Sequence, residues 1–161
     1  MLTEKLQKLV EDLSVKLKAR GWKLVTAESC TGGGLGFWLT SIPGSSEWFD
    51  RGYITYSNNA KIEMLGISFH LLERYGAVSE QVVVEMAENA LAQSSVHASI
   101  AITGIAGPDG GTSEKPVGYT WIAVAGSGLK THSECHVFPG DRAWIREQAI
   151  FRAIHQLFLM I

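Results

Sequence analysis

A hydroxyl and a thiol stand directly before a run of glycines. Residues 26–34 read Thr-Ala-Glu-Ser-Cys-Thr-Gly-Gly-Gly, so Ser29 lies where an expected strand meets a glycine-rich helix start. A helix N-terminus offers unpaired N–H groups that favour negative charge. An oxyanion formed at Ser29 could therefore be held by the backbone N–H of Cys30 or Thr31. We expect Cys30, Thr31 and Gly32 to contact a substrate.

Two other interpretations of this segment stay open. Ser29 or Thr31 could simply cap the helix, which is the strongest local preference of serine and threonine. The G-x-S-x-G pattern of a nucleophile elbow is absent. Cys30 is a rival nucleophile, but no histidine lies near it in the sequence, and a buried structural cysteine is the more ordinary expectation.

A serine nucleophile needs a base, and Lys61 is the candidate. The five histidines are scattered and define no Ser/His/Asp order. Lys61 falls in the first turn of a helix expected near residues 59–66. The helix dipole there and desolvation would both lower its pKa, and a neutral amine can accept a proton from serine. Tyr56, at the end of the preceding expected strand, could relay or donate a proton. The alternative is a solvated Lys61 and a Tyr56 at the edge of the core.

A second glycine-rich loop, residues 103–111, also follows an expected strand and begins with Thr103 and Gly104. Consecutive N–H groups in such a loop can form an anion-binding nest. The loop lacks the G-K-[ST] of an ATP-binding P-loop. We expect a phosphate near Gly107 and Arg142, while a tight structural turn is the alternative.

One pattern is compatible with a metal site. His132, Glu134 and His136 would share one face of a strand. A solvated hairpin face explains this alternation better, so no metal and no cofactor is expected.

Hydrophobic periodicity and turn residues indicate an α/β protein. Strands interleaved with helices, followed by a hairpin, predict one domain over residues 1–161, a three-layer α/β/α sandwich with a mixed, mostly parallel sheet. Ser68, Ser79 and Asp141 are the expected N-caps of three helices. The expected helices cover residues 2–19, 32–41, 59–66, 68–75, 80–93 and a last one from 141; the expected strands cover 23–27, 52–57, 97–103, 117–125 and 129–138.

Composition narrows the function classes. Fourteen Lys and Arg against sixteen Asp and Glu give a net charge of −2, which argues against a nucleic-acid-coating protein. No uninterrupted apolar run indicates a membrane span or a signal peptide. Two cysteines make no disulfide framework, so we expect a cytoplasmic protein. A homodimer is possible, with an apolar patch supplied by Trp48, Phe49, Trp144 and Phe158.

Together and in this order, the motifs closely resemble the CinA C-terminal domain family, over about residues 3–158. The segments that carry the resemblance are residues 23–32 (KLVTAESCTG), 44–58 (GSSEWFDRGYITYSN), 76–80 (GAVSE), 101–111 (AITGIAGPDGG), 115–118 (KPVG) and 140–142 (GDR).

The standalone bacterial members of this family are nicotinamide-nucleotide amidohydrolases. The resemblance therefore implies a small-molecule nucleotide substrate and hydrolysis of the carboxamide of nicotinamide mononucleotide. It implies a Ser/Lys mechanism at Ser29 and Lys61, supported by Tyr56. The family often carries a second, molybdopterin-biosynthesis-like N-terminal domain, and we expect this chain, like the standalone members, to be without it. The alternative function is a regulatory module that binds a nucleotide without turning it over.

Overall fold

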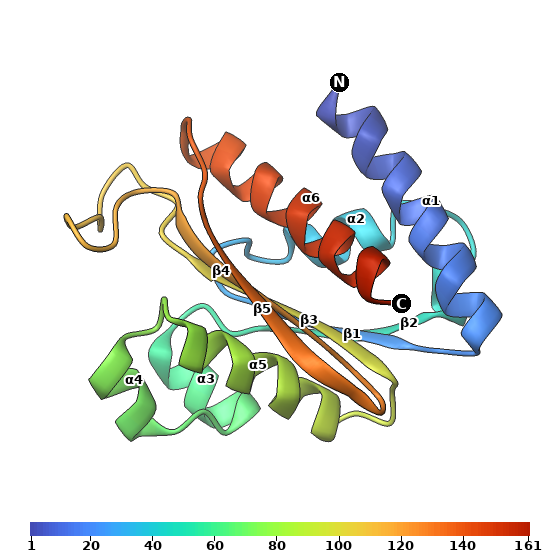
Figure 1. Cartoon of the computed structure of the whole chain (residues 1–161), viewed down its shortest axis with the longest axis horizontal. Coiled ribbons are helices and arrows are strands. Elements are labelled where there is room, and N and C mark those ends of the chain that lie inside the picture. The colour runs from blue at the N-terminus through green and yellow to red at the C-terminus, as the bar shows by residue number, and fades with distance from the viewer.

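A central sheet lies between two layers of helices in the computed structural model, which describes residues 1–161 (Figure 1). The strands are β1 (Leu24–Glu28), β2 (Phe49–Ile54), β3 (Ala98–Gly104), β4 (Tyr119–Gly126) and β5 (Leu129–Val137). The helices are α1 (Leu2–Arg20), α2 (Gly34–Leu39), α3 (Asn58–Leu65), α4 (Phe69–Tyr75), α5 (Glu80–Ala92) and α6 (Arg142–Met160), with a short 3-10 turn at Ser45–Glu47. The three-layer α/β prediction is confirmed.

The sheet is mixed, with strand order β2-β1-β3-β4-β5. β1 pairs in parallel with both β2 and β3, whereas β4 pairs antiparallel with β3 and β5. Only β4 therefore runs against the other four strands. β4 and β5 form the expected hairpin around Ser127 and Gly128, where Gly128 takes a φ of 73°.

Strand β3 shows why both faces of the sheet are covered. Ile100 and Ile102 pack with α1, α2 and α6 on one face, while Ala101 faces α5 on the other. The side chains alternate with a period of two, as a strand requires. The small alanines let α5, with its own Ala87 and Ala90, approach the sheet closely. A strand buried on both faces reads as a near-continuous apolar run, which residues 98–102 show except for Ser99, whose buried hydroxyl donates to Ala87 O.

The expected N-caps are confirmed. The side chains of Ser68, Ser79 and Asp141 accept from the backbone N–H of Leu71, Val82 and Trp144, at the starts of α4, α5 and α6. None of the helices has the length and the apolar character needed to cross a membrane.

Two elements differ from the sequence expectation. The strand expected at residues 52–57 covers Phe49–Ile54, because its parallel register with β1 begins opposite Leu24. The helix expected at residues 32–41 begins only at Gly34 and ends at Leu39. Gly32 and Gly33 adopt positive φ angles of 57° and 99°, so they form a turn and cannot continue a right-handed helix.

One of the four residues expected to supply an apolar patch for a dimer is buried in the core. Trp48 is 1% exposed and belongs to the core beneath α1 and α6, and Phe49 and Phe158 are half-buried against that core. Of the four, only Trp144 is largely exposed, at 43%.

The topology creates a crevice at one edge of the sheet. β1, β2 and β3 are parallel, so their carboxyl ends meet at this edge. The chain leaves β1 toward α2 on one face and leaves β2 toward α3, α4 and α5 on the other (Figure 1). Connections that diverge in this way open a crevice outside the strand ends, which is the usual ligand site of open α/β sheets.

Candidate active site

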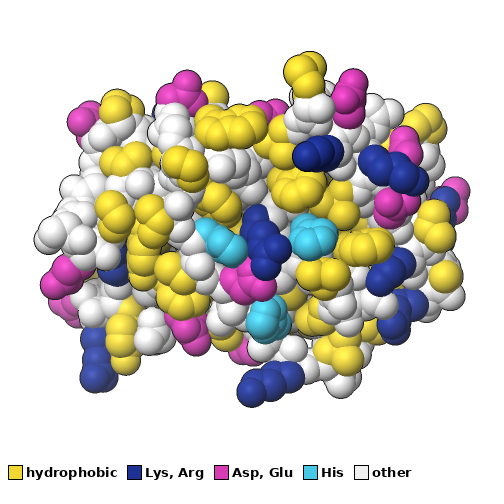
Figure 2. Space-filling view, turned by 45° about the horizontal axis from the view of Figure 1, so that its top comes forward, with side chains coloured by type: hydrophobic (Ala, Val, Ile, Leu, Met, Phe, Trp, Pro, Cys, Tyr) yellow, Lys and Arg dark blue, Asp and Glu magenta, His cyan; other side chains and the backbone are white.

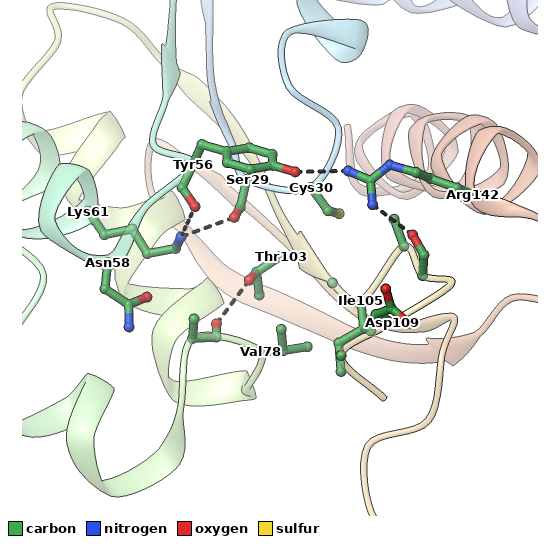
Figure 3. A pocket seen from close by; sticks show the side chains of 15 residues that line it. Ser29, Cys30, Tyr56, Asn58, Lys61, Val78, Thr103, Ile105, Asp109 and Arg142 are labelled. Carbon is green, nitrogen blue, oxygen red and sulfur yellow. Dashed lines mark hydrogen bonds between the residues drawn. The ribbon is translucent and has the colours of Figure 1, made fainter. Parts of the chain in front are cut away.

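Ser29 and Lys61 meet in this crevice. Ser29 directly follows β1, and Lys61 lies in the first turn of α3, whose N-cap is Ser57. Lys61 Nζ lies 3.0 Å from Ser29 Oγ (Figure 3). The two residues are separated by 32 positions in the sequence, and the parallel pairing of β1 with β2 brings them together. The expected nucleophile and base are therefore within direct proton-transfer distance.

The amine of Lys61 lies in an unusual environment. The residue is 1% exposed, and Nζ contacts the backbone oxygens of Thr55 at 2.8 Å and Tyr56 at 3.5 Å. No carboxylate forms an ion pair with it. Burial lowers the pKa of Lys61 from 10.5 to about 8, because desolvation disfavours the charged form. About one tenth of the chains therefore carry a neutral Lys61 at pH 7.

Cys30 is a poor nucleophile in this structure. Burial raises the pKa of its thiol from 9.0 to about 11, so the reactive thiolate is scarce at neutral pH. The side chain is 7% exposed and contributes to the core beneath α6. The expectation of a buried structural cysteine is confirmed.

The turn after Ser29 is organised by a residue that the sequence analysis did not single out. Neither Ser29 nor Thr31 caps α2, whose N-cap is Gly33. The carboxylate of Glu28 accepts from the backbone N–H of Gly33, Leu35 and Gly36. These N–H groups are thus already satisfied and are not available to a substrate. The capping interpretation of Ser29 is therefore wrong.

Two backbone N–H groups beside Ser29 remain unpaired. The residues Cys30 and Thr31 are buried, yet the N–H of neither has an acceptor, whereas Gly32 N donates to Ser29 O at 3.0 Å. Nearly all buried backbone N–H groups in proteins are paired. Cys30 lines the pocket beside Ser29, whereas Thr31 is fully buried and, like Gly32, does not line it. An unpaired N–H next to a hydroxyl in a pocket is what an oxyanion hole requires, and the N–H of Cys30 meets this condition.

The expected substrate loop forms the opposite wall of the pocket. The cavity has a volume of about 300 Å³, at the lower end of the range for small-molecule sites. Thr103, Gly104 and Gly107 line it together with Ser29 and Lys61. The Thr103 hydroxyl donates to Ala77 O at 2.9 Å, so its proton is already engaged. A side chain at position 104 would come within 2.7 Å of Thr120 Oγ1, which explains the glycine.

Tyr56 and Arg142 close one side of this pocket. The Arg142 guanidinium donates to the Tyr56 hydroxyl at 2.9 Å and to Gly107 O at 2.8 Å (Figure 3). The structure brings Tyr56 to the pocket, but its hydroxyl bonds to Arg142, and only its backbone oxygen contacts Lys61. The N–H groups of Ala106 and Gly107 have no acceptor, which suits an anion beside Arg142.

The alternating histidines on β5 share one acidic partner. Glu134 accepts from Arg152 at 2.9 Å and contacts His132 and His136. No group of three or more His, Cys, Asp and Glu side chains in the structure is arranged to hold a metal ion. Figure 2 shows histidines gathered around basic and acidic side chains on this face. Partial burial acts to raise the pKa of Glu134, but hydrogen bonds from Arg152, His136 and His132 outweigh it and lower that pKa. The expected solvated face is only partly so, because Glu134 and His136 are about a quarter exposed and Glu134 bonds to Arg152 on α6.

Several known proteins are similar to this chain in sequence and in fold. The CinA C-terminal domain matches residues 6–161. The chain is 49% identical to a "Nicotinamide-nucleotide amidohydrolase PncC" from Escherichia coli over 161 residues, covering 98% of this chain and 96% of that protein. A protein of the same name from Enterobacter agglomerans is 49% identical over 149 residues, covering 92% of this chain and 91% of that protein.

A solved structure supports the same relationship. The competence/damage inducible protein of Agrobacterium tumefaciens superposes with a TM-score of 0.93 at 37% sequence identity, over 96% of this chain and 94% of that one. Because the sequence match spans nearly the whole domain and the fold agrees, this chain belongs to the CinA C-terminal domain family.

Proposed function

We propose that this chain hydrolyses the carboxamide of nicotinamide mononucleotide to nicotinate mononucleotide and ammonia through a Ser/Lys acyl-enzyme mechanism. The observation that carries the proposal is the 3.0 Å contact between Ser29 Oγ and a fully buried Lys61 amine with a pKa lowered to about 8. The names of the close relatives, nicotinamide-nucleotide amidohydrolase, support the choice of substrate.

The contacts of Lys61 determine the direction of the lone pair on its neutral amine nitrogen. A neutral amine has two N–H donors and one acceptor lone pair. The backbone oxygens of Thr55 and Tyr56 take the two donors, so the lone pair faces Ser29 Oγ. Ser29 then donates its proton to Lys61 as its oxygen attacks the amide carbon.

The developing negative charge falls on the amide oxygen. The unpaired N–H of Cys30, a residue that lines the pocket, binds this oxygen, and such a donor contributes on the order of 10²–10³ in rate. The Lys61 ammonium returns its proton to the departing nitrogen, ammonia leaves, and Ser29 becomes an acyl ester. Lys61, neutral again, takes a proton from water as the water oxygen attacks the ester carbon, and it returns that proton to Ser29 Oγ when the ester bond breaks and nicotinate mononucleotide leaves.

The phosphate of the substrate belongs at the Arg142 end of the pocket. Arg142 uses two of its five N–H donors on Tyr56 and Gly107, which leaves three for an anion. The unpaired N–H groups of Ala106 and Gly107 lie on the same loop. Because the Tyr56 hydroxyl is held by Arg142, we assign the proton transfers to Lys61 and give Tyr56 a role in shaping the pocket.

The test measures ammonia release from nicotinamide mononucleotide, nicotinamide riboside and nicotinamide by the wild-type chain, Ser29→Ala and Lys61→Ala. We expect release with wild type, strongest for the mononucleotide, and a loss of at least about 10³-fold in both variants. Ser127→Ala and Lys130→Ala, exposed in the hairpin at the far edge of the sheet, are the matched controls. Near-wild-type turnover by Ser29→Ala or Lys61→Ala contradicts the mechanism. Binding of the mononucleotide without ammonia release indicates a nucleotide-binding module instead.

A further inference from the structure

Glu28 is a buried carboxylate with no part in the chemistry above. It is 2% exposed and does not line the pocket. Oε1 accepts from the Thr31 hydroxyl at 2.6 Å and from Leu35 N at 2.9 Å, and Oε2 accepts from Gly36 N at 3.1 Å. With Gly33 N at 3.2 Å, four donors converge on one carboxylate. A side chain engaged in this way fixes the backbone around it.

Arg146 holds the same turn from α6. Its Nε donates to Cys30 O and its Nη2 donates to Thr31 O, both at 3.1 Å. Arg146 forms no ion pair with a carboxylate. Because the guanidinium has no acidic partner and donates to two backbone oxygens, it holds those two carbonyl groups in a fixed direction.

The direction of a carbonyl fixes that of the next N–H. In a trans peptide the C=O and the following N–H point opposite ways within one plane. The Thr31 carbonyl, held by Arg146, therefore orients the N–H of Gly32, which donates to Ser29 O at 3.0 Å. The Ser29 carbonyl in turn orients the N–H of Cys30. Glu28 occupies N–H groups at the start of the following helix, so the N–H of Cys30 is left as the unpaired donor of a residue that lines the pocket.

We propose that Glu28 and Arg146 are positioning residues that clamp the turn 29–33 from opposite sides and so align the oxyanion-binding N–H of Cys30. This rests on the proposed function, since the clamp matters only if Ser29 is acylated. Arg146 controls the direction of the peptide planes, and Glu28 prevents the turn from joining α2.

The clamp acts on the transition state and not on ground-state binding. The amide oxygen becomes negative only during attack, so a misdirected N–H lowers kcat while KM changes little. Displacing a catalytic group by about 1 Å can cost about 10²-fold in rate. A purely structural role would instead lower the amount of folded protein and leave the kinetic constants of the folded fraction unchanged.

The experiment compares Arg146→Met, Arg146→Lys and Glu28→Gln with wild type, each checked for folding by thermal unfolding. Arg152→Met and Glu134→Gln are matched controls, because they remove the same residue types from an ion pair away from the pocket. Two readouts are taken: kcat and KM for ammonia release, and the rate at which a fluorophosphonate probe labels Ser29. Labelling also needs an oxyanion site but does not depend on the identity of the natural substrate.

We expect kcat and the labelling rate to fall together by roughly 10- to 100-fold in folded Arg146→Met and Glu28→Gln, with KM within about twofold. Arg146→Lys, which can reach one of the two carbonyls, should give an intermediate rate. Unchanged rates in folded Arg146→Met, or an equal loss in Arg152→Met, overturn the clamp. If wild type is labelled but releases no ammonia, the proposed substrate is wrong and the labelling rates still decide the clamp. A wild-type chain that does neither overturns both.

Discussion

The low pKa of Lys61 makes activity and stability depend on pH in a linked way. Ammonia release requires neutral Lys61, whose pKa is about 8. We therefore expect kcat/KM to fall about tenfold for each pH unit below 8 and to level off above it. Initial rates of ammonia release between pH 5.5 and 9.5 measure this, with the substrate well below KM.

The same group changes the free energy of unfolding. In the unfolded chain Lys61 returns to its ordinary pKa of 10.5. Between pH 8 and 10.5 the unfolded state binds more protons than the folded one, so this contribution to stability rises with pH. Below pH 8 both states are protonated and the folded state bears the whole cost of the buried charge. Proton-binding curves with these two pKa values give a gain of about 2 kcal/mol between pH 7 and 9.5.

The assay is urea unfolding of wild type and Lys61→Met at pH 7, 8, 9 and 9.5. Subtracting the variant removes the titration of the remaining groups, so the difference isolates Lys61. We expect wild type to gain about 2 kcal/mol relative to the variant over this range. A difference that stays flat, together with a rate that is constant down to pH 6, would show that Lys61 has an ordinary pKa and would refute its role as the base.

Three further changes test other parts of the structure. Cys30→Ala should keep most of the ammonia release, because a thiol with a pKa of about 11 is not the nucleophile; loss of activity in a folded variant would contradict this. Arg142→Met should raise KM for nicotinamide mononucleotide about 10- to 100-fold, as expected for a lost charge-assisted hydrogen bond, and should change KM for nicotinamide riboside much less; equal effects on both would remove the phosphate assignment. Trp48→Ala should destabilise the chain by about 3–5 kcal/mol in urea unfolding, because Trp48 is 1% exposed; a cost below about 1 kcal/mol would argue against its burial.

The sequence predicts the fold well because the apolar pattern is strong. Helix caps such as Ser79 and Asp141 and the apolar runs of β3 and β4 are local signals, and local signals can be read without knowing the neighbours. β2 is the exception. Its sequence, Phe49–Ile54, is largely exposed on an edge, so its bounds come from pairing with β1, a contact that lies outside any short window.

The site could be predicted in part for the same reason. Lys61 is visible as a cation in the first turn of a helix, where the dipole disfavours it, and Ser29 as a hydroxyl directly before a glycine run; the structure brings the two together. Glu28 gives no comparable signal, since a glutamate at the end of a strand looks like an ordinary surface residue. Its partners are the N–H groups of Gly33, Leu35 and Gly36, and donors on the backbone leave no trace in the sequence. The expectation that the α2 N-terminus would face a substrate failed because Glu28 already occupies it.

The position of the Glu28 carboxylate also bears on the pKa of Lys61. Lys61 can lose its proton near pH 8 because burial disfavours its charged form, and no carboxylate forms an ion pair that would offset this. Glu28, one residue before the nucleophile, would provide such a partner if its carboxylate turned toward the pocket, and a nearby opposite charge would raise the pKa of Lys61 again. The backbone N–H groups of α2 hold Glu28 away, and Arg146 holds the carbonyls on the other side. The glycines at positions 32 and 33 permit this turn through their positive φ angles. The glycine run therefore matters for Lys61 as well as for Ser29, because it lets the start of α2 hold the Glu28 carboxylate away from the pocket.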